Sequence, residues 1–286
     1  MEHAAIEKMI RRVEEIPTLP IIITRILEVL EASDSSSKDL EQVISYDQSI
    51  AAKVLRIANS AYYGFSGEIT TIHRAIVVLG FQTVRGLALG SSIFETFSRL
   101  GRTSYFDRRA FWVHSIACSR CSRALGKVVG QFDAEVAFLA GLIHDIGMVI
   151  MDHTVHDHYR QVLEKAIKRN LVLDEIERET FGFDHGRVGA WLGERWKFPS
   201  PLLAAIEFHH RVFESKDHQT LVAAINIADF CSDVAGMSIV GIENDRSLPE
   251  EVPEHLGITK EQLDPLVTML MEETDQIEGF FSAISR

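Results

Sequence analysis

The sequence Phe138-Leu-Ala-Gly-Leu-Ile-His-Asp-Ile-Gly147 places an adjacent histidine and aspartate inside an otherwise apolar segment. Burying these two polar side chains is costly unless a partner satisfies both of them. Neighbouring residues on a helix point about 100° apart, yet His144 and Asp145 can both reach one ion set beside the helix. A histidine nitrogen with a carboxylate oxygen suits iron, manganese, zinc or nickel better than magnesium or calcium. Alone, the pair is weak evidence for a metal, and a helix-terminal aspartate with a hydrogen-bonded core histidine explains it better.

Several other polar residues also lie within apolar segments, far from this pair in the sequence. Each of them could separately be a hydrogen-bonded core residue or a helix cap. A single metal site explains all of them at once, because imidazoles and carboxylates are the usual ligands of such metals. The residues are His114, His185, His209, His210 and Asp229.

Helical periodicity dominates the remaining sequence, and we find no convincing period-two alternation of the kind that strands show. The apolar residues of 19–30 recur at helical spacing, and Ser36 with Asp39 forms the pattern of a capping box. The sequence therefore predicts an all-α protein. In the second half, helices are expected near 107–126, 132–152, 154–169, 184–196, 199–209 and 218–235. A long loop over 241–259 and a final pair of helices over about 260–284 follow.

Composition excludes several classes of protein. The chain has 286 residues, of which 46% are hydrophobic and 24% charged, so it is not disordered. With 29 basic and 41 acidic residues the net charge is −12, which argues against binding to nucleic acid or to anionic membranes. Glycine and charge interrupt the longest apolar stretch, Ala137–Ile150, so we expect no membrane span. The lack of a signal-peptide pattern and the three cysteines favour the reducing cytoplasm.

Four separated motifs of the chain belong together: Ile16-Pro-Thr-Leu-Pro20, Asp47–Ser60, Ile72–Gly80 and Phe138–Gly147. They resemble the HDOD domain, the HD-related output domain of bacterial signalling proteins, and the resemblance covers about residues 10–235. It implies an all-helical fold in which an N-terminal helical bundle, residues 1–104, packs on a C-terminal HD-like bundle, residues 105–286, that includes the C-terminal helices.

The order of the polar residues is similar to the metal-binding pattern of the HD superfamily of phosphohydrolases. By resemblance to the HD-GYP phosphodiesterases, one metal ion is expected on His114, His144, Asp145 and Asp229. Asp145 would bridge to a second ion on His185, His209 and His210. The resemblance thus implies two divalent or trivalent transition metal ions, with iron first and manganese, zinc or nickel as alternatives.

Three positions depart from the HD-GYP pattern. Its lysine three positions after the aspartate is Met148 here, and a glutamate one turn before the first histidine is Ala110. Its Gly-Tyr-Pro motif is replaced by Arg211-Val-Phe-Glu-Ser-Lys. These changes remove a phosphate-binding or acid role and the substrate-specific loop. The sequence therefore favours a metal site over hydrolysis of cyclic di-GMP.

The resemblance implies a cytoplasmic bacterial signal-transduction protein of HDOD type that retains a dinuclear metal site. We expect it to act mainly by binding a phosphorylated small-molecule ligand or an unknown signalling protein partner. The alternative is an active metal-dependent phosphohydrolase or phosphodiesterase that uses a metal-bridging hydroxide. A third hypothesis is a protein-interaction module that binds no metal and has many histidines in its core. No segment resembles a receiver module, so we expect the input signal to come from another protein.

Two weaker patterns favour structural roles. His153 and His156 are spaced for metal ligation, but a polar, solvated helix junction explains them better. Cys118 and Cys121 resemble half of a zinc site, but no second pair accompanies them, so buried thiols are the better interpretation.

Overall fold

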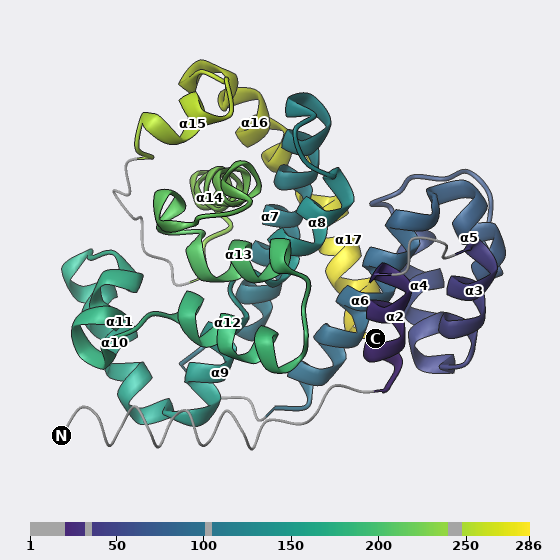
Figure 1. Ribbon diagram of the computed structural model, residues 1–286, viewed down its shortest axis with the longest axis horizontal. Coiled ribbons are helices and arrows are strands. Elements are labelled where there is room, and N and C mark those ends of the chain that lie inside the picture. The colour runs from purple at the N-terminus through teal and green to yellow at the C-terminus, as the bar shows by residue number, and fades with distance from the viewer. Residues whose placement is uncertain (1–20, 32–35, 101–104, 240–247) are drawn as a thin grey trace. The chain divides into compact units, whose positions relative to one another are not determined.

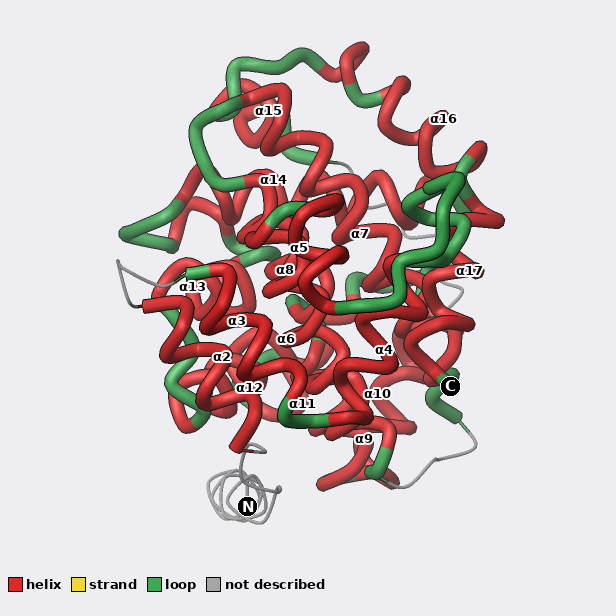
Figure 2. Tube along the Cα trace, turned by 90° about the vertical axis from the view of Figure 1, so that its right-hand side faces the viewer, coloured by secondary structure: helices red, strands yellow, loops and turns green. Residues whose placement is uncertain are grey.

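The structure is a computed structural model that describes residues 21–31, 36–100, 105–239 and 248–286. The described residues form helices joined by loops, and none of them lies in a strand (Figure 2). This confirms the all-α prediction. The helices divide into two compact units. Among the described residues, unit 1 holds 105–271, and unit 2 holds 21–100 together with 272–286.

Unit 2 is a bundle formed by the first five helices and the last helix of the described residues. Its helices are α2 (Ile21–Glu31), α3 (Ser37–Ser45), α4 (Gln48–Ala58), α5 (Ile72–Leu79), α6 (Phe81–Ser98) and α17 (Thr274–Ser285) (Figure 1). The expected capping box opens α3, since Ser36 accepts from the backbone of Asp39 and Asp39 accepts in return. Asp47 caps α4 in a similar way. Gly80, at a φ of 92°, joins α5 to α6 in a conformation that favours glycine.

Helix α17 differs from the sequence prediction, which grouped both C-terminal helices with the second half of the chain. Its apolar residues Ile277, Phe280 and Ile284 are buried, and the helix packs against α4 and α6 of unit 2. The ammonium of Lys53 on α4 donates to the backbone carbonyl of Ile284 at 3.0 Å. The physical reason is that an amphipathic helix shows which face it buries but not which partner covers that face.

Unit 1 is built around the long helix α7 (Arg108–Val129), which packs on α8 (Ala134–Ile143) and α14 (Gln219–Val234) (Figure 1). Helix α12 (His185–Arg195) packs on α9 (Ile146–Thr154) and α13 (Ser200–Phe208). The unit also contains α10 (His156–Arg169), α11 (Leu173–Phe181), α15 (Glu251–His255) and α16 (Asp264–Glu272), with short 3-10 turns at Val212–Glu214 and Lys260–Gln262.

Unit 1 departs from the sequence prediction in three places. The helix expected over 132–152 is two helices, α8 and α9, that meet at His144 and Asp145. Helix α11 was not predicted, because most of its nine residues are polar or charged. Only a few apolar positions, among them Leu173 and Ile176, mark the face that it buries together with Glu177. The expected loop over 241–259 contains the short helix α15, while residues 240–247 lie outside the described part of the chain.

Two glycines allow the helices of unit 1 to approach one another closely. A Cβ atom on Gly141 would come within 2.8 Å of the backbone of Ser119, which lies on α7. A Cβ atom on Gly147 would lie 1.8 Å from the carbonyl oxygen of His185, at the start of α12. Both glycines come from the stretch around His144 and Asp145, so they hold this stretch against two neighbouring helices.

One stretch, Ala134–Thr154, is apolar and long enough to cross a membrane by length and composition alone. It spans α8 and α9, and 83% of its most apolar window is buried inside the protein. Burial in the core of unit 1 accounts for its apolar character, because core helices pass the same test.

Candidate metal centre

Three helices bring the first group of candidate ligands together. His114 lies in α7, Asp229 lies in α14, and His144 ends α8. Nε2 of His114 lies 3.1 Å from Oδ1 of Asp229, and Nε2 of His144 lies 3.9 Å from the same oxygen. All three side chains are buried, and their ligand atoms lie within 4.8 Å of one another.

The second group comes from the ends of other helices. His185 is the first residue of α12, and His209 and His210 follow directly after α13. Nε2 of His185 lies 3.2 Å from Nε2 of His209 and 2.9 Å from Nε2 of His210. With Asp145 these residues form a second group of four whose ligand atoms lie within 4.8 Å of one another.

Asp145 faces both groups. Its Oδ2 lies 3.1 Å from Nε2 of His144 and 3.7 Å from Nε2 of His114. Its Oδ1 lies 3.2 Å from Nε2 of both His185 and His209. Asp145 sits between α8 and α9 at φ −96° and ψ 11°, in a sparsely populated region where many active-site residues lie. The break between the two helices therefore positions a carboxylate whose two oxygens face different groups.

The hydrogen bonds of the histidine rings prepare their Nε2 atoms to bind a cation. In three of the rings, Nδ1 lies at hydrogen-bonding distance from a backbone carbonyl oxygen. The distances are 2.9 Å from His114 to Met237, 2.8 Å from His144 to Gly141 and 2.8 Å from His209 to Ile206. A carbonyl oxygen only accepts, so each Nδ1 must donate its proton, and in a neutral ring the lone pair is then on Nε2. These lone pairs converge in the centre, which is the arrangement that metal ligands require.

Other observations show that the residues fit a bound cation. Nε2 of His114, Nε2 of His144 and Oδ1 of Asp145 are buried and make no hydrogen bond of good geometry with any residue that the structure describes. Lone pairs of neighbouring imidazoles repel one another at 2.9–3.2 Å unless a proton or a cation lies between them. Without hydrogen bonds or a cation, buried groups of this kind are costly. The donor set of imidazoles with carboxylates suits transition metals.

The charges of the centre also favour a cation. Burial lowers the pKa of His144, but the neighbouring Asp145 charge outweighs it and holds that pKa well above its usual range. Burial likewise opposes protonation of His185, yet Glu177 and Asp145 raise its pKa well above the ordinary value. Burial alone would raise the pKa of Asp145, but the facing histidines hold it well below its usual range. The Asp145 carboxylate thus remains ionised and attracts positive charge.

Ion pairs tie the two segments of the second group together. Asp184, which precedes His185, is buried and caps α12 by accepting from the backbone of Arg187. It also contacts the guanidinium of Arg178 at 2.8 Å and that of Arg211, the residue after His210. The pair between Asp184 and Arg211 therefore fixes the start of α12 relative to the segment that follows α13.

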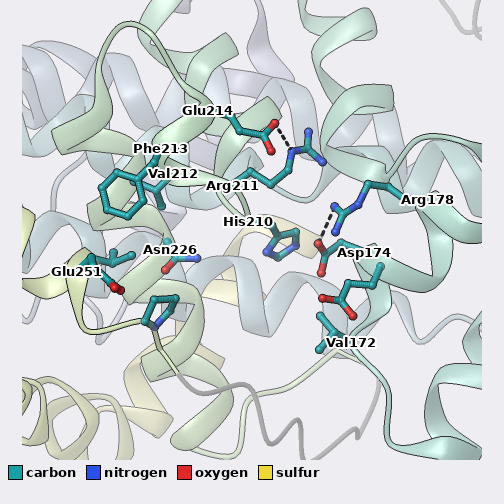
Figure 3. A pocket seen from close by; sticks show the side chains of 13 residues that line it. Val172, Asp174, Arg178, His210, Arg211, Val212, Phe213, Glu214, Asn226 and Glu251 are labelled. Atoms are coloured by element: carbon teal, nitrogen blue, oxygen red, sulfur yellow. Dashed lines mark hydrogen bonds and ion pairs between the residues drawn. The ribbon is translucent and has the colours of Figure 1, made fainter.

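A cavity of about 710 Å³ adjoins the second group, and His210 lies on its wall (Figure 3). Arg178 and Arg211 line it as ion pairs with Asp174 and Glu214, as the dashed lines show. The opposite side carries Phe213 and other apolar residues. A ligand in this cavity can therefore reach His210 without entering the buried core.

All seven residues singled out from the sequence lie in unit 1, within the two groups described above. The weaker candidates belong to neither group: His156 contacts Asp152 at 3.2 Å, and the cysteines are buried free thiols, although that of Cys118 contacts His144. Sequence reasoning missed Glu177, Tyr159 and Asp184, which support the centre from behind. A helical stripe that pairs Glu177 with Leu173 and Ile176 was the available signal.

Comparisons with known proteins agree with this fold. The sequence profile of the HDOD domain matches residues 16–212. A protein of Treponema pallidum (strain Nichols), named "Uncharacterized protein", is 25% identical over 224 residues, which are 76% of this chain and 42% of that protein. The chain thus spans less than half the length of this relative.

Two solved structures share the fold at lower identity. A "Putative signal transduction protein" from Marinobacter aquaeolei VT8 has a TM-score of 0.83 at 22% identity, over 100% of this chain and 67% of that one. A "Putative phosphohydrolase" from Shewanella amazonensis SB2B has a TM-score of 0.77 at 24% identity, over 97% and 98% of the two chains.

The fold and the two groups define an all-helical protein with a buried centre of histidines and aspartates. Because the HDOD profile covers more than half of its length, the chain belongs to the HDOD family.

Proposed function

We propose that this chain is a bacterial, cytoplasmic signal-transduction protein whose dinuclear metal centre binds a phosphorylated small molecule, with contact to a signalling protein partner as its output. His114, His144 and Asp229 would hold one ion, and His185, His209 and His210 the other, with Asp145 shared. Iron is the first expectation, with manganese, zinc or nickel as alternatives, because imidazole and carboxylate ligands suit these ions. The buried free thiols are consistent with a reducing compartment.

The observation that carries this proposal is the position of Asp145 between the two groups. Its two carboxylate oxygens lie within 3.1–3.2 Å of three histidine nitrogens that belong to different helices. Such convergence of buried polar atoms is costly for a protein that binds nothing there.

The cavity beside His210 is where this chain would receive the ligand. Bound metal ions would supply the positive charge that attracts and polarises a phosphoryl group. The remainder of the ligand would lie in the cavity, between the wall that carries Phe213 and the wall that carries Arg178. Both guanidiniums of the cavity are already paired with carboxylates, so they shape the wall more than they add net charge.

The second candidate is an active phosphohydrolase. It is favoured by the complete set of ligand positions and by a cavity that reaches the centre. The binding role is favoured by the residue three positions after Asp145, where Met148 is buried and has no proton to donate. A hydrolase would therefore need another proton source for its leaving group.

Metal analysis of the purified full chain tests the proposal first. We expect two ions per chain in the wild type, one in His114→Ala and none in Asp145→Ala, because Asp145 faces both groups. Asp157→Ala removes an exposed aspartate and serves as the matched control. A folded wild type that binds no metal when supplied with iron, manganese, zinc or nickel would contradict the proposal.

A panel of phosphomonoesters, nucleotides and cyclic dinucleotides then separates the two candidates. Binding without turnover supports the signalling role. Turnover that disappears in Asp145→Ala but persists in Asp157→Ala would establish the hydrolase instead.

A further inference from the structure

A buried carboxylate, Glu177 on α11, lies directly behind His185. Its side chain is 0% exposed, although a buried charge is costly unless it is fully hydrogen-bonded. Oε1 accepts from the hydroxyl of Tyr159 at 2.9 Å. Oε2 accepts from the backbone N–H of His185 at 2.8 Å and faces its ring Nδ1 at 2.7 Å. Three donors from two other helices thus satisfy this one carboxylate.

The contact between Glu177 and Nδ1 determines which nitrogen of the His185 ring carries the proton. An ionised carboxylate only accepts hydrogen bonds, so Nδ1 carries the proton and Nε2 presents a lone pair when the ring is neutral. That Nε2 faces Asp145, His209 and His210 at 2.9–3.2 Å. A carboxylate on the far nitrogen both fixes the ring orientation and makes the ligand nitrogen more basic.

His185 differs in this respect from the other candidate ligands with a described Nδ1 contact at hydrogen-bonding distance. His114, His144 and His209 donate to neutral backbone carbonyls. Only at His185, among these four, does a charged group fill this role at hydrogen-bonding distance. The hydroxyl of the fully buried Tyr159 in turn holds Glu177. We call this set of contacts, from Tyr159 on α10 through Glu177 on α11 to His185 on α12, the relay.

We propose that Glu177 is a positioning residue for the second metal position, and that Tyr159 fixes Glu177 in place. The proposal rests on the metal centre described under the proposed function. Glu177 contacts no ligand atom of the centre itself. It acts through His185, whose nitrogen it aims and strengthens as a donor.

Cobalt(II) titration of the full chain tests the relay, because the absorption of bound cobalt reports ligand number and geometry. Glu177→Gln keeps the shape of the side chain but removes its charge. We expect its affinity for the second cobalt ion to fall about 10–100-fold, the usual effect of losing such a partner, while the first ion binds as in the wild type. The spectrum of the second ion should also shift.

Tyr159→Phe removes only the hydroxyl and keeps the ring that fills the core. It should weaken the second cobalt position in the same direction but to a smaller extent than Glu177→Gln. Glu179→Gln is the matched control, since Glu179 lies on the same helix and pairs with Lys165 at an exposed position. Glu177→Asp keeps the charge and should recover part of the lost affinity.

The outcomes separate the relay from the metal centre itself. If the wild type binds two cobalt ions and both Glu177→Gln and Tyr159→Phe match its affinity and spectrum, the relay is wrong while the centre stands. If the wild type binds none, the proposed function fails and the relay with it. Should Glu177→Gln not fold, Tyr159→Phe and Glu177→Asp decide the matter by the same readout.

Discussion

Gly147→Ala tests whether the contact between α9 and α12 holds the centre together. The added Cβ would lie 1.8 Å from the carbonyl oxygen of His185, and reaching even 3.0 Å requires a shift of 3.0 − 1.8 = 1.2 Å. The obstacle is backbone, which cannot rotate away as a side chain can. Overpacking of a core typically costs about 1–3 kcal/mol, and this contact belongs at the upper end or beyond. The better helix propensity of alanine returns about 1 kcal/mol, so we expect a net loss of about 2 kcal/mol or more.

The assay is urea or thermal unfolding of the metal-free chain, followed by metal analysis of the loaded chain. For a unit of this size, about 2 kcal/mol corresponds to a midpoint shift of about 4–8 °C. Metal content should also fall, because the clash displaces His185 from Asp145. Gly279→Ala is the matched control: its Cβ would meet Ala61 at an ordinary 3.8 Å, so alanine in α17 should be neutral or stabilising. A Gly147→Ala protein within about 0.5 kcal/mol of wild type and with full metal content would refute the reasoning.

Further predictions concern the ion pairs, the metal and the thiols. Asp184→Ala removes the carboxylate shared by Arg178 and Arg211. Because these two arginine side chains are 33% and 20% exposed, we expect the free energy of unfolding in urea to fall by about 2–3 kcal/mol, which is below the range for fully buried pairs. A fall of less than about 1 kcal/mol would contradict this role. Stripping the metal with a strong chelator should lower the unfolding midpoint, since a ligand at 100 times its Kd contributes about 2.7 kcal/mol; an unchanged midpoint would mean that no metal had stabilised the fold. Because the pKa of His144 is raised, protons compete with the metal already near neutral pH, and metal affinity measured by titration should fall as the pH is lowered; affinity independent of pH would speak against these ligands. Burial raises the pKa of Cys118 to about 11, so the thiol stays protonated at pH 8 and should resist alkylation until the protein is denatured; mass spectrometry showing label on native Cys118 would contradict its burial.

Local signals in the sequence were sufficient for most helices. Ser36 and Asp39, for example, form the predicted capping box through contacts within one turn of the chain, independently of the rest of the fold. The adjacent His144 and Asp145, by contrast, were predicted inside one continuous helix, because apolar residues recur at helical spacing on both sides of them. Two residues after Asp145, Gly147 closely approaches α12, which comes from a distant part of the chain and which no local pattern announces.

The candidate ligands were recognisable because polar residues in apolar company are rare and the order of their types resembles a known pattern. Glu177 was missed, because a glutamate in a charged segment normally faces solvent and its helical spacing from Leu173 is a weak signal. Its burial follows from the packing of α11 near α10, and from a hydroxyl on Tyr159 that no short-range pattern links to it. Tertiary contacts of this kind fix the supporting residues of a site, while sequence types indicate the ligands.

The location of α17 in unit 2 has a consequence for how the chain is synthesised. The ribosome translates residues 21–100 first, then unit 1, and only afterwards the helix that packs on α4 and α6. Domains generally fold as units while the nascent chain emerges. The apolar surface of α4 and α6 that α17 covers therefore stays exposed to solvent and to chaperones while all of unit 1 is being made, and it is buried only once α17 has been translated.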